Sequence, residues 1–162
     1  MVATTQDLFQ HFKRLGIETK TVKHLAVYTV EEAKALRGEL PGAHSKNLFL
    51  KDKKGRFWLI VALEDQAIDL KALRKIIGAA QLSFGKPEAL AEKLGVEPGS
   101  VTPFSVINDS EQAVTVVLDR ELLALEPLNF HPLVNTATTQ ISADNLLAFL
   151  CDCGHDPLIT AL

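Results

Sequence analysis

The most strongly patterned part of the sequence reads Asn47-Leu-Phe-Leu-Lys-Asp52, then Lys53-Lys54-Gly55, then Arg56-Phe-Trp-Leu-Ile-Val-Ala-Leu63. The two outer runs are rich in aromatic and branched apolar residues, which favour β-strands. Gly55 suits the turn between them because glycine adopts backbone conformations that other residues avoid. The stretch therefore predicts a β-hairpin, and with it an antiparallel strand pair.

Helices are predicted on both sides of this hairpin from apolar spacing and from capping residues. The predicted helices cover residues 5–15, 30–37, 70–77, 87–94 and 143–152, and the last four begin at or just after Thr29, Asp69, Pro87 and Ser142. In the helix over 70–77, the apolar residues Leu70, Leu73, Ile76 and Ile77 are expected to face inward.

Further strands are predicted over residues 20–24, 113–118 and 133–141, the last from its many β-branched residues. Lys46 comes directly before the first strand of the hairpin and is expected at a loop–strand junction, and the proline after His131 favours an extended backbone at that residue. The irregular mixture of helices and strands predicts an α/β fold of the α+β type, with a mixed β-sheet flanked by helices.

The composition is that of a folded protein. The chain has 162 residues, 47% of them apolar and 23% charged, which predicts one domain over residues 1–162. The longest apolar runs are too short to cross a bilayer, and the first residues lack the pattern of a secretory signal. With only two cysteines, we expect a reduced, cytoplasmic protein without a membrane partner.

Charge is unevenly distributed along the chain. Residues 1–60 hold 11 Lys and Arg against 6 Asp and Glu, whereas residues 61–162 hold 6 against 14. This split is compatible with an anion-binding surface on a protein of net charge −3, and equally with a solvated surface of mixed charge. The residues available for phosphate contacts are Lys34, Arg37, Lys51, Lys53, Lys54, Lys71, Arg74 and Lys75.

Standard catalytic motifs are missing from the sequence. It contains no phosphate-binding glycine loop, no His-Glu-x-x-His helix and no Gly-x-Ser-x-Gly turn. The segment Cys151-Asp-Cys-Gly-His155 has one residue between its cysteines, and no second cluster completes four zinc ligands. We therefore expect neither a metal site nor a cofactor.

Three segments could still form a site. Ser45 follows His44, but sequence neighbours rarely have the geometry of a nucleophile and its base, whereas Lys46 is suited to hold a phosphate or carbonyl oxygen. The glycine- and proline-rich loop over 95–104 can bring backbone N–H groups to an anion. His131 precedes a proline and is either a buried structural residue or an acid/base group.

The order of several separated motifs resembles the YbaK/prolyl-tRNA-synthetase-associated editing domains. The motifs are Lys46-Asn47-Leu-Phe-Leu, Leu94-Gly-Val-Glu-Pro-Gly-Ser-Val-Thr-Pro-Phe104, Asn108-Asp109, Asn129-Phe-His-Pro132 and Asn135-Thr-Ala-Thr-Thr139. The resemblance extends from about residue 20 to the end and is greatest to the freestanding alanyl-tRNA(Pro) deacylases called ProXp-ala. A freestanding form is also expected because 162 residues hold no synthetase catalytic or anticodon-binding domain.

The resemblance implies a role for each matching residue. Lys46 matches the critical lysine of the family and would hold the 3′ end of the substrate, with Asn47 contacting the ribose or ester. Gly99, Ser100, Val101, Thr102 and Pro103 match the loop that contacts the aminoacyl group, and His131 matches a histidine near the pocket of the alanine-specific members. Lys34 and Arg37 are the nearest Lys and Arg residues before Lys46 in the sequence and are candidates for contact with the tRNA.

The family implies hydrolysis of a misacylated tRNA(Pro) by a positioned water, without a protein nucleophile or metal. Such an enzyme would meet the acceptor end of the tRNA and, transiently, prolyl-tRNA synthetase and elongation factor. Alanine is the expected amino acid, because a synthetic site built for proline cannot exclude a smaller one by size. Cysteine or serine as the amino acid, and a non-catalytic tRNA-binding module, remain the alternatives.

Overall fold

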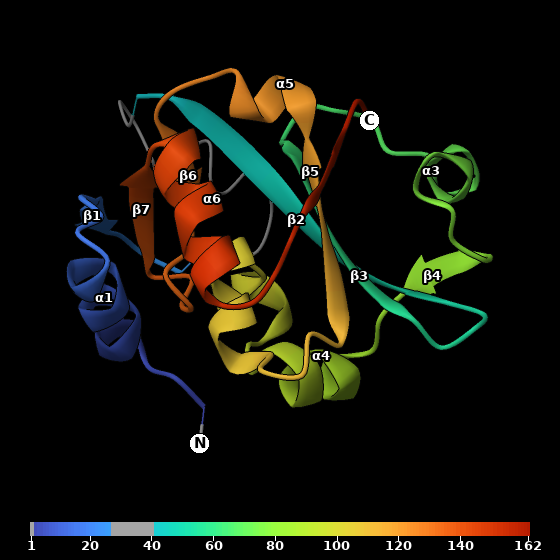
Figure 1. The fold of residues 1–162 in the computed structure, drawn as a ribbon, viewed down its shortest axis with the longest axis horizontal. Helices are drawn as coiled ribbons and strands as arrows, with labels where there is room; N and C mark the ends of the chain where they lie inside the picture. The colour runs from blue at the N-terminus through green and yellow to red at the C-terminus, as the bar shows by residue number, and fades with distance from the viewer. Residues whose placement is uncertain (1, 27–40) are drawn as a thin grey trace.

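A mixed β-sheet with helices on both faces forms the body of the molecule (Figure 1). The computed structural model describes residues 2–26 and 41–162, so the predicted helix over 30–37, Lys34 and Arg37 lie outside the described residues. The helices are α1 (Thr5–Arg14), α3 (Leu70–Ile77), α4 (Pro87–Leu94), α5 (Arg120–Leu123) and α6 (Ala143–Asp152). Two short 3₁₀ segments, Pro98–Ser100 and Pro103–Asn108, follow α4.

Eight strands of the described residues belong to this sheet. They are β1 (Lys20–Lys23), β2 (Ala43–Asp52), β3 (Phe57–Leu63), β4 (Leu82–Phe84), β5 (Val114–Asp119), β6 (Leu128–Phe130), β7 (Ala137–Ile141) and β8 (Leu158–Thr160). Their order is β1-β7-β6-β2-β3-β5-β8, and β4 pairs with β2. β2 is antiparallel to β3 and parallel to β6, which confirms the predicted mixed sheet.

The predicted caps begin the helices for the expected reasons. Asp69 accepts a hydrogen bond from the N–H of Lys71 and begins α3, and Ser142 accepts one from Asn145 and begins α6. Pro87 occupies the first turn of α4, where its missing N–H costs no hydrogen bond. These local signals therefore located α3, α4 and α6 correctly.

The two faces of the sheet are covered by different elements. On one face, α1, α4 and α6 pack Phe12, Leu94 and Phe149 into the larger apolar core. On the other face, α3 packs Leu73 and Ile77 against Leu50, Trp58 and Ile60, in a smaller core. We call these the large-core face and the α3 face.

Two sequence predictions about apolar segments were wrong in part. The strand predicted over 133–141 begins only at Ala137, because Leu133 adopts a left-handed backbone with φ of 71° in the turn after β6. Ile76 was expected to face inward, but it is 46% exposed because it lies on the flank of α3 rather than on its buried face.

The segment before the hairpin also differs from its prediction as a loop. β2 begins at Ala43, so Lys46 lies inside the strand and not at a loop–strand junction. Residues 128–130, for which the sequence predicted no element, form β6, and Ala43 and His44 pair with Leu128 and Asn129. This pairing between distant segments extends both strands beyond what their own residues favour.

No helix in the described ranges, 2–26 and 41–162, is long and apolar enough to cross a membrane. The helices α1, α3 and α6 have 10, 8 and 10 residues, whereas about 20 are needed to span a bilayer.

Candidate active site

Neighbouring candidate residues on β2 face opposite sides of the sheet. The β2–β3 pairing runs without interruption from Ser45 to Lys51, so successive side chains alternate between the faces. Phe49 lies in the large core and Leu50 in the smaller one, which fixes the assignment. Asn47 therefore shares the large-core face with Phe49, whereas Lys46 lies on the α3 face.

Lys46 is a half-buried lysine without a partner. Within the described part of the chain its ammonium makes no hydrogen bond and no ion pair. Its neighbour across the strand pair is Ala62, and Leu48 follows it on the same face. A lysine ammonium without a partner is a compact positive charge that can hold a phosphate or carbonyl oxygen. Lys46 is therefore arranged to meet a negatively charged or strongly polar ligand.

His131 follows β6, the strand that pairs with the start of β2. β2 and β6 run parallel, with His44 beside Asn129. Lys46 lies two residues after His44, and His131 lies two residues after Asn129. The pairing thus brings the segments that carry Lys46 and His131 side by side, although they are far apart in the chain.

The surroundings of His131 favour its neutral form. Burial lowers the pKa of His131 below its ordinary value of 6.5, and the nearby His24 lowers it further, although the hydrogen bond to Ala137 opposes both. The rings of His24 and His131 are 6.3 Å apart, centre to centre. The Nδ1 atom of His131 lies 3.0 Å from the carbonyl oxygen of Ala137, which can only accept, so Nδ1 carries the proton. Its Nε2 is then an acceptor.

A chain of hydrogen bonds leads from Asn47 to β6. Asn47 Nδ2 donates to Ser45 Oγ at 3.3 Å, and Ser45 Oγ donates to the carbonyl oxygen of Asn129 at 3.2 Å. The Ser45 hydroxyl is thus engaged in this chain and faces away from its neighbour His44. Asn47 Oδ1 is buried and has no hydrogen-bond partner among the described residues. An orphaned acceptor of this kind is costly unless a ligand donates to it.

A second polar group, to which the sequence predictions assign no role, lies on β6 and β7. Asn129 and Gln140 are paired across β6 and β7, are 4% and 8% exposed, and both donate to the carbonyl oxygen of Pro41. They share the face of Lys46. The available signal was their position inside apolar β-strands, where long polar side chains are unusual.

The loop Gly99–Pro103 lies with the large core. Thr102 and Pro103 are buried, Val101 packs against the large core, and the following Phe104 is fully buried there. The structure thus groups this loop with the face of Asn47 and separates it from the face of Lys46.

Hydrogen bonds inside the loop narrow the choice of anion-binding donors. Ser100 N–H donates to the Glu97 carbonyl oxygen at 2.9 Å, and Phe104 N–H donates to the Thr102 hydroxyl at 3.3 Å. Among the described residues, the N–H groups of Val101 and Thr102 have no such acceptor. These two are the donors that the loop can offer to a ligand.

The cysteine and histidine residues near the C-terminus serve packing. His155 Nε2 lies 2.9 Å from Asp109 Oδ2, and both residues are buried. Burial and the adjacent Asp152 raise the pKa of the Cys153 thiol to about 12, whereas Cys151 is exposed. No group of three or more potential metal ligands occurs within residues 2–26 and 41–162.

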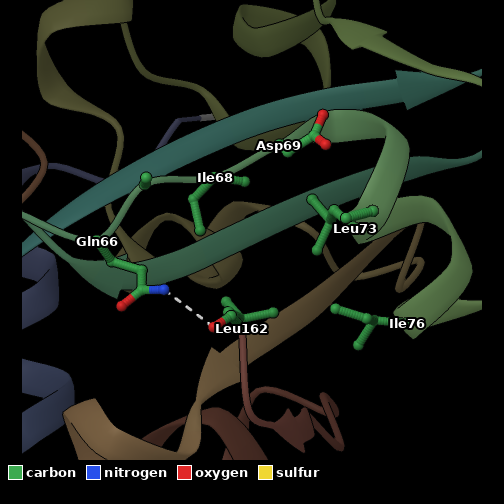
Figure 2. Close-up of a pocket in the computed structure, with 8 residues that line it drawn as sticks. Gln66, Ile68, Asp69, Leu73, Ile76 and Leu162 are labelled. Atoms are coloured by element: carbon green, nitrogen blue, oxygen red, sulfur yellow. Dashed lines mark hydrogen bonds between the residues drawn. The ribbon is translucent and has the colours of Figure 1, made fainter.

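An apolar cavity of about 140 Å³ lies beside α3, away from these candidates. Figure 2 shows Leu73, Ile76 and Leu162 around it, with Gln66 donating a hydrogen bond to the Leu162 carbonyl oxygen at 2.9 Å. None of Lys46, Asn47, His131 or the loop residues lines this cavity. It is therefore separate from the candidate site.

Comparison with known proteins defines the class to which this fold and these motifs belong. Residues 24–149 match the model of the aminoacyl-tRNA editing domain, and the chain belongs to this family. Within it, the similarity is to proteins associated with prolyl-tRNA synthetase. A prolyl-tRNA synthetase associated domain-containing protein of Danio rerio is 41% identical over 156 residues, which cover 95% of this chain and 85% of the relative.

Two further comparisons support the same class. The prolyl-tRNA editing protein ProX of Acetoanaerobium sticklandii is 39% identical over 142 residues, 87% of each chain. A crystal structure described as a candidate trans-editing enzyme for prolyl-tRNA synthetase superposes with a TM-score of 0.73 and 22% identity, over 100% of this chain and 98% of that one. At that identity the superposition supports the fold alone, and it agrees with the predicted architecture.

Proposed function

We propose that this chain is a single editing domain that hydrolyses alanyl-tRNA(Pro) in trans. The observations that carry the proposal are a half-buried Lys46 whose ammonium pairs with no described residue, and a buried His131 whose pKa is lowered by that burial, on segments joined by the pairing of β2 with β6. The membership of the family and the 39% identity to an editing protein support hydrolysis of an aminoacyl ester. Prolyl-tRNA synthetase and elongation factor are proposed as transient partners in the cytoplasm.

The proposed reaction needs a held ester and a held water. Lys46 binds the phosphate or carbonyl oxygen at the 3′ end, and His131 Nε2 accepts a hydrogen bond from the attacking water. The water oxygen bonds to the carbonyl carbon, the bond from that carbon to the ribose oxygen breaks, and the water proton passes to the ribose oxygen. An aminoacyl ester is reactive enough for positioning and charge stabilisation to suffice.

The remaining candidates are proposed as contacts to the aminoacyl ribose. Asn47 supplies an orphaned acceptor, and Val101 and Thr102 supply N–H donors without an acceptor among the described residues. These groups lie on the other face of the sheet from Lys46, so they act together only if the substrate reaches around the edge of the strand pair. We propose Gly99, Ser100 and Pro103 as residues that shape this loop.

The test is hydrolysis of three esters of the same tRNA. We expect alanyl-tRNA(Pro) to be deacylated and prolyl-tRNA(Pro) to be left intact, with cysteinyl-tRNA(Pro) measured alongside. Release of cysteine but not alanine would keep the editing activity and refute the proposed amino acid. Survival of all three esters together with tRNA binding would refute hydrolysis and favour the binding-module alternative.

Replacement of His131 by asparagine is expected to slow alanyl-tRNA(Pro) hydrolysis by about 10²-fold, as loss of an acid/base group does. Asparagine can still donate to the Ala137 carbonyl oxygen but lacks the acceptor at the position of Nε2. Because the pKa of His131 is lowered, the wild-type rate should fall only as the pH drops below about 6.5, when the imidazole gains a proton.

The single-turnover rate between pH 5 and 8 measures this effect. The decrease in rate at acidic pH should be present in the wild type and absent in His131→Asn. A variant that keeps both the rate and the decline would exclude His131 from the reaction and leave it a structural residue.

A further inference from the structure

The strongest unassigned feature is a group of exposed cations on the opposite side of the view from β1 and β7 (Figure 1). Three of them lie on α3 and three on the turn between β2 and β3 (Figure 1). We define the basic surface as Lys53, Lys54, Arg56, Lys71, Arg74 and Lys75, all exposed.

The cations of α3 form one stripe because of their helical spacing. Lys71, Arg74 and Lys75 are three and four residues apart and so lie on one side of the helix. Leu73 and Ile77 point into the smaller core, and Ile76 points to the other flank, beside the apolar cavity (Figure 2). The stripe is therefore free of buried contacts and faces solvent.

Hydrogen bonds hold the turn against the end of α3. Arg56 Nη2 donates to the Gly78 carbonyl oxygen at 3.1 Å, and the N–H of Lys53 donates to the Gln81 carbonyl oxygen at 3.1 Å. The buried Asp52 receives bonds from both sides, from the N–H of Arg56 and from the N–H of Ala80. The two groups of cations thus form one preorganised surface.

The charge of this surface is largely uncompensated. Among the described residues, only Arg56 of the six forms an ion pair, with Asp52. Asp69 is the exposed carboxylate nearest in sequence to the α3 stripe, and it caps the helix through the N–H of Lys71. On a chain of net charge −3, an unpaired cluster of cations favours a polyanionic partner.

The position of the surface relates it to the candidate site. α3 packs on the sheet face that carries Lys46, and β2 runs from Lys46 to the turn. The six steps along the strand from Lys46 to Asp52 span about 20 Å at the rise of a β-strand. An RNA whose 3′ end lies at Lys46 can reach the turn and α3 with its next nucleotides.

We propose that the basic surface binds the sugar-phosphate backbone of the tRNA behind its aminoacylated end. This inference rests on the proposed function for the identity of the RNA. The contacts are electrostatic and carry no base specificity, so they contribute affinity and orientation rather than amino-acid selection.

The experiment compares double variants of the full chain, in each of which two positively charged side chains are replaced by uncharged glutamine. Arg74→Gln with Lys75→Gln, and Lys53→Gln with Lys54→Gln, each remove two charges from the surface. The control pair is Lys13→Gln with Lys20→Gln, two exposed lysines on α1 and β1, and Lys13, like Lys75, lies in the last turn of its helix. Deacylated tRNA(Pro) and its alanyl ester are the ligands, over a range of salt concentrations.

We expect each surface pair to weaken tRNA binding at least about fivefold at low salt and to reduce the slope of log K against log salt by about 1.5, as loss of two phosphate contacts predicts. The control pair should leave both unchanged. A short substrate, alanine esterified to the terminal trinucleotide, should be hydrolysed equally by all variants, since it ends before the basic surface.

The inference would be overturned if the surface variants bound tRNA as tightly as the control variant and with the same dependence of log K on log salt. Loss of activity on the short substrate in the surface variants would also overturn it, because the defect would then lie in the site or the fold. If the wild type hydrolyses neither alanyl-tRNA(Pro) nor the alanyl trinucleotide, the proposed function fails. Weaker tRNA binding by the surface variants alone would still support the basic surface as a tRNA-binding surface. Binding of an acidic protein but not of tRNA would assign the surface to a different partner.

Discussion

Lys46→Ala is expected to reduce kcat/KM for alanyl-tRNA(Pro) by about 10²–10³-fold, the usual effect of removing one group that stabilises developing charge. The expectation follows from the unpaired ammonium of Lys46 beside Ala62 and Leu48. The same change should leave the melting temperature unchanged or raise it, because it removes a half-buried cation that no described residue pairs. Steady-state deacylation and thermal unfolding measure the two effects.

The control for this variant is Lys51→Ala on the same strand. Lys51 is exposed and its ammonium lies over the ring of Phe57 at 5.7 Å, so its loss should change the rate by less than about twofold. Lys46→Arg keeps the charge but not the compact ammonium, and we expect partial activity. Equal rates for Lys46→Ala and Lys51→Ala would remove Lys46 from the reaction.

Asp52→Ala is expected to lower the free energy of unfolding by about 2–3 kcal/mol, because the N–H groups that donate to the buried carboxylate lose their acceptor. Asp52 is 3% exposed and pairs with the Arg56 side chain, and its carboxylate also accepts the N–H groups of Lys54, Arg56 and Ala80. Denaturant unfolding measures the loss. The tRNA affinity should fall as well, since the basic surface depends on the same bonds.

The control is Asp69→Ala, which removes an exposed carboxylate that caps α3 by one bond. Its expected cost is about 1 kcal/mol, typical of a lost N-cap. Equal decreases in the free energy of unfolding for Asp52→Ala and Asp69→Ala would show that the hydrogen bonds of Asp52 stabilise the fold no more than a helix cap at the surface does.

The protonation of Asp52 adds a dependence on pH. Burial raises the pKa of Asp52, but hydrogen bonds from Arg56, Ala80 and Trp58 outweigh it and hold the pKa at about 2, below its ordinary value of 3.8. A lowered folded-state pKa stabilises the fold above pH 4, and this contribution is lost as the pH falls toward 2. The stability difference between wild type and Asp52→Asn should therefore narrow over that range.

The sequence alone determined the local elements of this protein. The apolar runs and Gly55 located the hairpin, and Asp69, Pro87 and Ser142 located the starts of three helices, because caps and turns depend on residues next to them in the chain. The order of separated motifs was enough to indicate the family. The predicted roles of Lys46, Asn47, His131 and the loop over 99–103 remain predictions.

Only the tertiary structure decided how those residues are grouped. The parallel pairing of β2 with β6 joins segments more than 80 residues apart, as the bond from Ser45 to Asn129 illustrates, and no local pattern encodes it. That pairing extended β2 beyond the hairpin, and the pairing of β2 with β3 turned Lys46 and Asn47 to opposite faces. The lowered pKa of His131 likewise depends on burial, which exists only in the folded chain.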